Sequence, residues 1–354
     1  MKILRWYGKR DMRLENVEKP TPGRSEVLVR VMRAGVCGTD LSEYWDGASM
    51  ICTDTPHPLT GHMGPTVMGH EFSGVVEMTG EGVSGEWKAG DRVCAMPMLH
   101  CGTCRYCKMG LFHLCESFGV IGLNTPWGGF GEYCIVPEYN LIRMPDGVTF
   151  EQAACLEPLS DALYAIRQGR VQAGDSVLVT GGNAPAMLCL MSAVAAGASR
   201  VYLACAGERR HALAREWGAA DMLELQDGSI AGQMQSLTGG YGVDVAIDCT
   251  GSEPVMREAL ASLRKRGMYV QCRMPKEGAS LPAADWLLKD LSLTGLWCCN
   301  THDMEKNMEL VASGRIPVEK VVTRVVDIEH LKDAFDMLIE NKSGDVKIQV
   351  SFER

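Results

Sequence analysis

From residue 151 onward, the sequence alternates between stretches typical of buried strands and stretches typical of helices. The predicted strands are 176–180, 200–204, 243–248 and 268–272, and the predicted helices are 156–167, 184–196 and 208–217. Strands that alternate with helices form a parallel sheet with helices on both faces. This part of the chain is therefore predicted to be a doubly wound α/β domain.

The first part of the chain has a different pattern. Residues 1–150 contain short β runs separated by glycine, proline and aspartate turn signals, with little helical periodicity. A chain of 354 residues is expected to hold more than one core. We predict a β-rich domain over 1–150, the α/β domain over 151–295, and a C-terminal segment, 296–354, that returns to the first domain.

Charge and hydropathy argue against several classes of partner. The net charge is −9, which disfavours binding to a nucleic-acid backbone or to an anionic membrane. Residues 1–10 lack the apolar core of a signal peptide, and the most apolar run, 184–198, is too short to span a membrane. We expect a soluble, cytoplasmic protein that acts on a small molecule.

Four cysteines cluster in one short stretch, a lobe at about 94–118. The spacing Cys101-x2-Cys104-x2-Cys107-x7-Cys115 lets one loop surround a tetrahedral ion. Four thiolates would complete the coordination of a structural zinc, which would hold this loop folded. An iron–sulfur cluster uses similar spacings, but Glu116 stands where a proline usually follows the last cysteine. The lobe is therefore predicted to bind structural zinc.

A second candidate metal site lies earlier in the chain. Cys37 is followed by Gly38-Thr39-Asp40, and 33 residues after Cys37 stand His70 and Glu71. A thiolate, an imidazole and a carboxylate suit a catalytic zinc, which takes three protein ligands and keeps one position for water or substrate. Alternatively, Cys37 and His70 are an ordinary buried cysteine and a hydrogen-bonded core histidine, which is the commoner role of either residue alone.

The first strand of the α/β domain ends in the turn Gly181-Gly182-Asn183-Ala184-Pro185-Ala186. Dinucleotide-binding folds have G-x-G-x-x-G here, so Asn183 replaces the second glycine and Ala186 the third. Asn183 can start the helix as its N-cap, and Pro185 is tolerated in the first helical turn. Within the alternating series, the turn predicts a dinucleotide site, to which we also assign Thr250.

The end of the next strand bears on the choice of cofactor. NAD-binding folds usually have an acidic residue there, which binds the ribose hydroxyls, but this chain has Cys205. Without a carboxylate to repel a 2′-phosphate, Arg209 or Arg210 could pair with that phosphate. Alternatively, both arginines only begin a solvated helix. The pattern favours NADP slightly over NAD.

The pieces that carry a family resemblance are Cys37-Gly38-Thr39-Asp40, Gly69-His70-Glu71, the four-cysteine lobe, Gly128-Gly129-Phe130-Gly131-Glu132-Tyr133, Leu156-Glu157-Pro158-Leu159 and the α/β half. In this order they resemble the zinc-dependent medium-chain alcohol and polyol dehydrogenases over essentially the whole chain. Residues 57–61 and 300–303 are similar to the butanediol dehydrogenase branch. The resemblance implies a GroES-like catalytic domain, a Rossmann coenzyme domain, an active site between them, and a homodimer or homotetramer.

The resemblance also implies roles for single residues. Cys37 and His70 match the catalytic zinc ligands, and Glu71 matches the carboxylate adjacent to them. Glu157 matches a further glutamate that binds zinc directly or through water. Thr39 matches the hydroxyl that receives the proton of the alcohol. Ser42 stands where many relatives have a histidine that passes this proton to solvent, so the proton exit departs from the family pattern.

The implied activity is hydride transfer between NAD(P) and a secondary alcohol, vicinal diol or polyol, as in 2,3-butanediol dehydrogenases. One catalytic and one structural zinc are expected. Alternative substrates are a sugar alcohol, threonine, or a cyclic or terpenoid alcohol. Because the turn at 181–186 and Ser42 depart from the family pattern, a zinc-stabilised nucleotide-binding protein without turnover is a second alternative.

Overall fold

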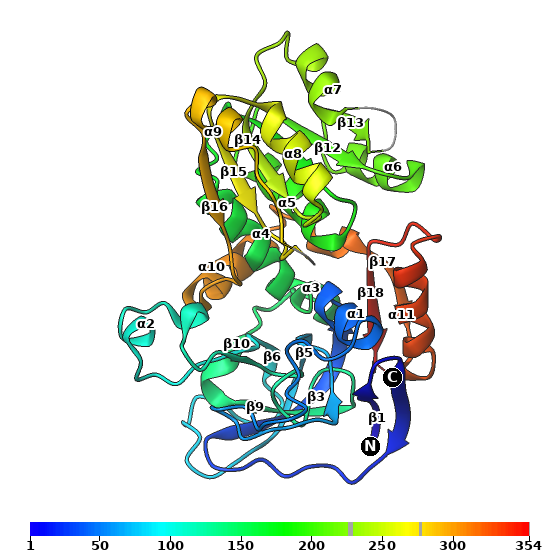
Figure 1. Ribbon diagram of the computed structural model, residues 1–354. Coiled ribbons are helices and arrows are strands. Elements are labelled where there is room, and N and C mark those ends of the chain that lie inside the picture. Colours follow the sequence, from blue (N-terminus) through cyan, green and yellow to red (C-terminus); the bar gives the residue numbers. More distant parts are fainter. Residues whose placement is uncertain (226–228, 276–277, 354) are drawn as a thin grey trace. The chain divides into compact units, whose positions relative to one another are not determined.

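The computed structural model describes residues 1–225, 229–275 and 278–353, without the side chains of Thr301 and His302. The chain divides into two units (Figure 1): a first unit of Met1–Glu157 with Asn300–Arg354, and a second unit of Pro158–Cys299. The boundaries between the two units, after Glu157 and after Cys299, lie a few residues later than the boundaries at residues 150 and 295 that the sequence predicted. One reason is that helix α3 (Phe150–Ala153) packs against strands of the first unit.

The first unit is rich in β-structure. Its strands are β1 (Lys2–Gly8), β2 (Asp11–Asn16), β3 (Glu26–Gly35), β4 (Thr66–Val67), β5 (Glu71–Thr79), β6 (Arg92–Ala95), β7 (Met98–Leu99), β8 (Gly119–Val120), β9 (Tyr133–Pro137), β10 (Leu141–Arg143), β17 (Val322–Val326) and β18 (Lys347–Ser351). Its other helices are α1 (Gly38–Trp45), α2 (Arg105–Lys108), α10 (Thr301–Ala312) and α11 (Leu331–Glu340).

Strand β3 organises the main sheet of the first unit. The strand order is β10-β6-β5-β3-β18-β17, and β9 also pairs with β3. The C-terminal β18 runs antiparallel to β3, with Val350 opposite Ala34. Val27, Val29 and Val31 lie on one face of β3, as the two-residue period of a strand requires, and pack in the same core; Leu28, on the other face, is also buried. The chain therefore leaves a firmly held strand just before the candidate metal ligand Cys37.

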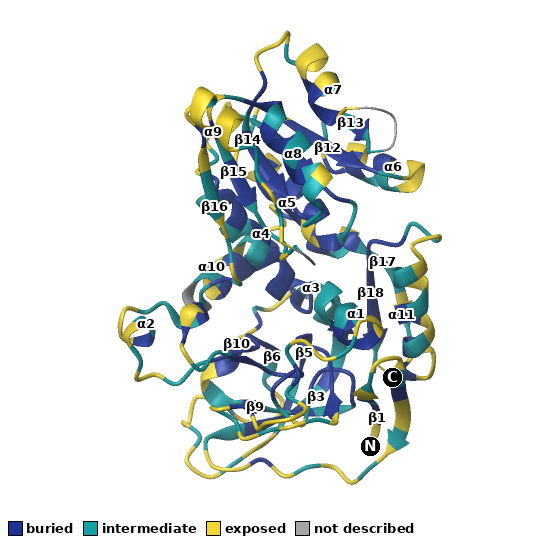
Figure 2. Ribbon diagram, in the orientation of Figure 1, coloured by how far each residue is buried: buried dark blue, intermediate teal, exposed yellow. Residues whose placement is uncertain are grey.

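The second unit is the predicted doubly wound domain. Its strands are β11 (Ser176–Thr180), β12 (Arg200–Cys205), β13 (Asp221–Glu224), β14 (Val243–Asp248), β15 (Leu263–Gln271) and β16 (Ser292–Gly295). Helix α4 (Leu156–Gln168) leads into it, and its other helices are α5 (Ala184–Ala195), α6 (Glu208–Glu216), α7 (Ile230–Leu237), α8 (Glu253–Ser262) and α9 (Ala283–Lys289). The central strands β11, β12 and β14 are mostly buried, whereas α9 is exposed along most of its length (Figure 2).

All neighbouring strands of this sheet are parallel, in the order β13-β12-β11-β14-β15-β16. This is the Rossmann order 3-2-1-4-5-6, so the α/β prediction is confirmed. In such sheets the strand order reverses between the first and fourth strands, and ligands bind beyond their carboxyl ends. Here those strands are β11 and β14, which lead into Gly181 and Cys249 respectively.

The sequence missed several shorter elements, including α1 and α7–α9. Helix α1 has eight residues, too few to show helical periodicity clearly.

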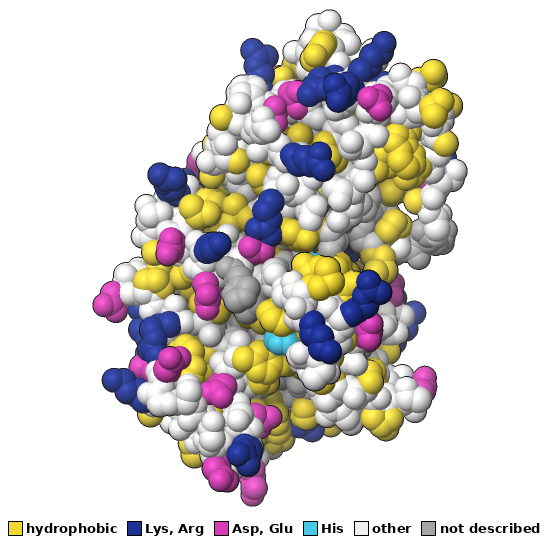
Figure 3. Space-filling view, turned by 90° about the vertical axis from the view of Figure 1, so that its left-hand side faces the viewer, with side chains coloured by type: hydrophobic (Ala, Val, Ile, Leu, Met, Phe, Trp, Pro, Cys, Tyr) yellow, Lys and Arg dark blue, Asp and Glu magenta, His cyan; other side chains and the backbone are white. Residues whose placement is uncertain are grey.

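None of the helices in the described part of the chain is long and apolar enough to cross a membrane. On the face drawn in Figure 3, Lys and Arg side chains are interspersed with Asp and Glu.

Candidate active site

Cys37 lies at the start of helix α1, where it is the N-cap. Its backbone N–H donates a hydrogen bond of 2.9 Å to Oδ2 of Asp40, in the first turn of the helix. The first N–H groups of a helix lack partners within it, and a carboxylate near them is favoured by the helix dipole. The sequence from Cys37 to Asp40 is therefore a helix start that holds the cysteine in place.

His70 and Glu71 lie where the chain enters β5, immediately after Gly69. Gly69 has φ +92°, and a Cβ atom there would lie 2.7 Å from Cδ1 of Phe130 and 2.9 Å from its backbone nitrogen. Only glycine fits this close approach of two segments. The glycine before His70 and the glycines before Phe130 are therefore parts of one packing arrangement, which fixes the position of His70.

The fold brings the three predicted ligands together. One ligand atom each of Cys37, His70 and Glu71 lies within 4.8 Å of the other two. His70 and Glu71 are buried, with 4% and 1% exposure. A sulfur, a nitrogen and an oxygen that converge in this way fit a zinc ion with mixed ligands. Of the two interpretations of the sequence, the geometry favours the metal site.

Asp40 is part of the Cys37–Asp40 motif, and the sequence predicted no role for it at the metal site. Its Oδ1 lies 3.5 Å from Nδ1 of His70, and the residue is fully buried. Although burial disfavours the imidazolium, the carboxylate of Asp40 and the nearby Cys37 raise the pKa of His70 well above its usual value. A carboxylate against one ring nitrogen fixes the orientation of a metal-binding histidine and leaves Nε2 for the metal.

Lys347 is the second residue next to the converging group whose role was not predicted from the sequence. Its Nζ donates hydrogen bonds to both carboxylate oxygens of Glu71, at 2.8 and 2.5 Å, and to the backbone oxygen of Val36 at 3.0 Å. Burial opposes its charge, but the Glu71 carboxylate raises the pKa of Lys347 above its usual value. Glu71 is thus an ion-pair partner as well as a member of the converging group.

Two hydroxyl groups lie on helix α1 beside this group. Oγ1 of Thr39 is 3.8 Å from Sγ of Cys37, which places it next to the converging ligands. Ser42 stands one turn further along the same helix, and its hydroxyl donates to the backbone oxygen of Gly38 at 3.1 Å. The further predicted ligand, Glu157, is buried at the start of α4, and its role as a ligand stays a prediction.

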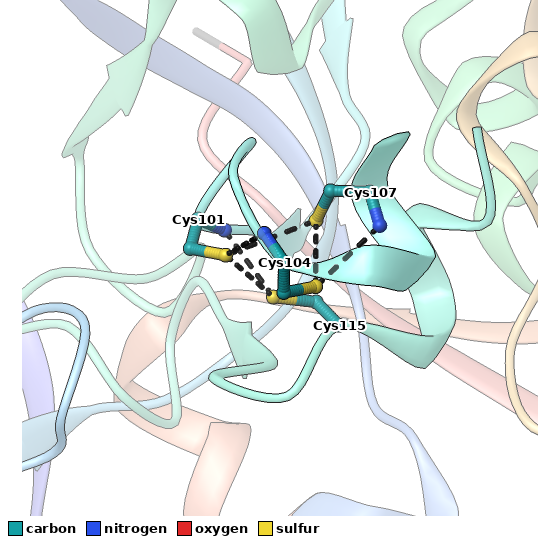
Figure 4. A group of neighbouring side chains, drawn as sticks. All are labelled: Cys101, Cys104, Cys107 and Cys115. Atoms are coloured by element: carbon teal, nitrogen blue, oxygen red, sulfur yellow. Dashed lines mark hydrogen bonds between the residues drawn. The ribbon is translucent and has the colours of Figure 1, made fainter. Parts of the chain in front are cut away.

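The four cysteines of the lobe also converge (Figure 4). The Sγ–Sγ distance is 3.5 Å for Cys101–Cys115 and for Cys104–Cys107, and 3.9 Å for Cys101–Cys107. Zinc–sulfur bonds of about 2.3 Å put the sulfurs of a tetrahedral site about 3.8 Å apart. Backbone N–H groups donate to the sulfurs, and together with Thr103 they lower the pKa of Cys101 to about 6. The lobe fits a four-thiolate zinc.

The turn after β11 has the expected form of a nucleotide site. Gly181 has φ +118°, and Asn183 is the N-cap of α5, with its Oδ1 accepting from the N–H of Ala186 at 3.1 Å. The N-cap prediction for Asn183 is confirmed, as is the position of Pro185 in the first turn. Asn183 has φ −87°, so it acts as a cap and not as a substitute for a left-handed glycine.

The residues predicted for the ribose end of the cofactor lie close to this turn. A Cβ atom on Gly182 would lie 2.7 Å from Cδ of Arg210 and 3.3 Å from Cβ of Cys205. Burial raises the pKa of Cys205 to about 12, so this position carries no charge at neutral pH. Arg209 is exposed on α6. Arg210 is therefore the cation that the fold places at the turn.

Thr250 follows β14 on the other side of the point where the strand order reverses. Its N–H and hydroxyl donate to Oδ1 of Asp248 at 3.1 and 2.7 Å, and Thr180 donates to the same oxygen at 2.5 Å. Asp248 is fully buried and thus ties the ends of β11 and β14 together. Thr250 is thereby held at the mouth of the predicted dinucleotide site.

Comparison with known proteins gives full-length matches. Residues 23–146 match the family "Alcohol dehydrogenase GroES-like domain", and residues 186–313 match "Zinc-binding dehydrogenase". The chain is 35% identical to (R,R)-butanediol dehydrogenase of Bacillus subtilis, covering 99% of both chains. It is 32% identical to the Probable D-xylulose reductase A of Arthroderma otae, covering 92% of this chain and 90% of that one.

A solved structure agrees with these matches. The crystal structure of 2R,3R-butanediol dehydrogenase from Bacillus subtilis superposes with a TM-score of 0.92 at 34% identity, covering 99% of each chain. The prediction that the first unit contains a GroES-like domain is confirmed by these comparisons.

Proposed function

This chain belongs to the zinc-dependent medium-chain alcohol dehydrogenases and is an oxidoreductase acting on CH–OH groups, and from this premise we propose its substrate, cofactor and site residues. The proposed substrate is a vicinal diol, or the hydroxyketone formed from it, and the proposed cofactor is NADP. The observation that carries the proposal is the convergence of Cys37, His70 and Glu71 within 4.8 Å.

Cys37 and His70 would hold the catalytic zinc, with Glu71 and Glu157 as the carboxylates available to complete its coordination. When bound, zinc supplies a Lewis acid that lowers the pKa of the substrate hydroxyl, and the nicotinamide accepts the hydride. Asp40 holds the ring of His70 in orientation, and Lys347 balances the charge of Glu71. A second, structural zinc would occupy the four-cysteine lobe.

The protein's own groups remove the hydroxyl proton. Thr39 is the proposed acceptor because its hydroxyl lies beside Cys37. Ser42 lies three residues further along α1, on the same face of the helix as Thr39. The proton of the Ser42 hydroxyl is directed at Gly38, so its oxygen is left to accept a hydrogen bond. To relay the proton, the Ser42 hydroxyl would turn away from Gly38, accept a proton through a water and release its own proton towards solvent.

The choice of a vicinal diol rests on the butanediol dehydrogenase relative, which is matched over its full length. Two loops of the first unit, residues 45–60 and 123–127, are proposed as walls of the substrate site, and they are joined by hydrogen bonds: Nδ2 of Asn124 donates to the oxygen of Met50 at 2.8 Å, and Thr60 donates to the oxygen of Asn124 at 2.6 Å. A polyol is the second candidate because of the D-xylulose reductase relative.

NADP is proposed over NAD because Cys205 is neutral where NAD-binding folds have a carboxylate, and because Arg210 lies against Gly182. An arginine pairs with a phosphate through two parallel hydrogen bonds, which makes it the usual ligand of the 2′-phosphate.

We also propose a cytoplasmic homo-oligomer, a dimer or tetramer, that assembles along the outer strand β16. Helix α9, which precedes that strand in the chain and contacts β15, exposes Leu287 and Leu288, at 80% and 74%. Two adjacent leucines that are this exposed on one short helix favour an interface.

The test is the rate of cofactor reduction with NAD and with NADP, against both enantiomers and the meso form of 2,3-butanediol, xylitol, sorbitol, threonine and a cyclic secondary alcohol. The proposal predicts the highest kcat/KM for a butanediol isomer with NADP. A higher kcat/KM for xylitol or sorbitol would assign the polyol function. No turnover with any pair, in protein that holds two zinc ions per chain, would contradict the proposal.

A further inference from the structure

A group of three cysteines converges in the second unit, apart from both candidate zinc sites. Cys189 lies on α5, Cys249 directly follows β14, and Cys272 directly follows β15. The three Sγ atoms all lie within 4.8 Å of one another, and those of Cys189 and Cys249 are 4.0 Å apart. We propose that these three cysteines, the thiol cluster, form a binding site for a soft monovalent metal ion, with Cu(I) as the best match.

The spacing of the sulfurs supports three-coordinate binding. A metal–sulfur bond of about 2.3 Å puts the sulfurs of a planar three-coordinate ion about 4.0 Å apart. Zinc prefers four ligands, whereas the converging set of His, Cys, Asp and Glu side chains among the described residues has three members here. Thiolates select soft ions such as Cu(I). Three sulfurs without a fourth ligand therefore favour Cu(I) over zinc.

The backbone around the thiol cluster is held in place before any ion binds. The N–H of Cys249 donates to the oxygen of Thr180 at 3.0 Å, and its own oxygen accepts from Nδ2 of Asn183 at 3.0 Å. The N–H of Cys272 donates to the oxygen of Asp248 at 2.8 Å. Ligands that are already positioned need little reordering on binding, which favours affinity.

One cysteine of the thiol cluster is nearer to solvent than the other two, which gives an ion a route of entry. Cys189 and Cys249 are each 1% exposed, whereas Cys272 is partly exposed at the end of β15. An ion can therefore meet Cys272 first and then be taken up by the two buried sulfurs, releasing thiol protons to water.

The test uses the zinc-loaded, full-length protein under anaerobic, reducing conditions. Cu(I) is supplied with an excess of a coloured Cu(I) chelator, and zinc is measured in the same sample. The expected result is one Cu(I) withheld from the chelator per chain, with no loss of zinc. Cys249→Ala and Cys272→Ser should each weaken this binding by about tenfold or more. Cys134→Ala, which removes a buried thiol of strand β9, should leave it unchanged.

X-ray absorption of the bound copper gives a second measurement that does not depend on the variants folding. The proposal predicts three sulfur ligands. Copper that is withheld equally by the cluster variants, that displaces zinc one for one, or that has nitrogen ligands would show binding at the zinc sites and overturn the proposal. So would the absence of any withheld copper.

Discussion

Lys347 donates hydrogen bonds to both carboxylate oxygens of Glu71, although the two residues are 276 positions apart in the sequence. Both side chains are almost completely buried, at 2% and 1% exposure. The pair joins the C-terminal strand β18 to the first residue of β5, next to the converging ligands. Lys347 thus balances a carboxylate charge that would otherwise be isolated in the core beside the candidate metal ligands Cys37 and His70.

Replacing Lys347 with Met should lower the free energy of unfolding by about 3–5 kcal/mol, because it leaves the Glu71 carboxylate buried without its partner. The measurement is urea-induced unfolding of the zinc-loaded protein. The double variant Glu71→Gln/Lys347→Met should lose less than the sum of the two single variants. Lys342→Met removes an exposed ion pair and should change stability by less than about 1 kcal/mol. Additive effects would show that the pair is not coupled.

Replacing Cys205 with Asp should shift the cofactor preference from NADP towards NAD by a factor on the order of ten or more, because a carboxylate would repel the 2′-phosphate and bind the ribose hydroxyls. Arg210→Ala should raise KM for NADP more than KM for NAD. Arg215→Ala, at the other end of α6, is the control. The NADP proposal is wrong if the unmodified protein already prefers NAD and Arg210→Ala changes neither constant.

Replacing Cys104 with Ser should remove one zinc per chain and lower the melting temperature by more than about 5 °C, since metal binding is the source of the lobe's stability. Cys52→Ser is the matched control because Cys52 is a partly exposed cysteine outside both zinc sites. Metal analysis and thermal unfolding check both variants. Unchanged zinc and melting temperature for Cys104→Ser would exclude the structural role.

Replacing Leu287 and Leu288 together with Lys should reduce the molecular mass in solution to that of the next smaller assembly, because two buried charges would oppose the interface at α9. Light scattering coupled to size-exclusion chromatography measures this mass. Tyr241→Lys changes another apolar side chain, 71% exposed, and should leave the assembly intact. An unchanged mass for the double leucine variant would place the interface elsewhere.

The parts of the fold that the sequence predicted are those with regular, local patterns. Strands β11 and β12 are largely apolar runs, and β14 is apolar apart from Asp244 and Asp248, so the strands and their alternation with helices could be read from local sequence patterns. The cap at Asn183 was likewise predictable, because capping depends on neighbours within one turn. Helices α8 and α9 were missed: α9 has no buried residue, so it lacks a marked apolar face.

The candidate ligands were visible in the sequence, whereas the residues that support them were not. Cys37 and His70 are chemically distinctive and stand beside glycines. Asp40 could have been assigned as a capping carboxylate, since it lies three residues after the N-cap. Lys347 carries no local signal, because its partner lies on another strand and its burial follows from the pairing of β18 with β3. Long-range pairs of this kind become visible only in the folded chain.

The central claim is that Cys37 and His70 hold a catalytic zinc, and the most direct measurement is zinc content together with turnover in Cys37→Ser and His70→Ala. Loss of a Lewis acid removes several kcal/mol of transition-state stabilisation. We therefore predict that zinc falls from two ions per chain to one, that turnover falls by about 1,000-fold or more, and that the melting transition stays cooperative. Full zinc content with retained turnover in either folded variant would contradict the account.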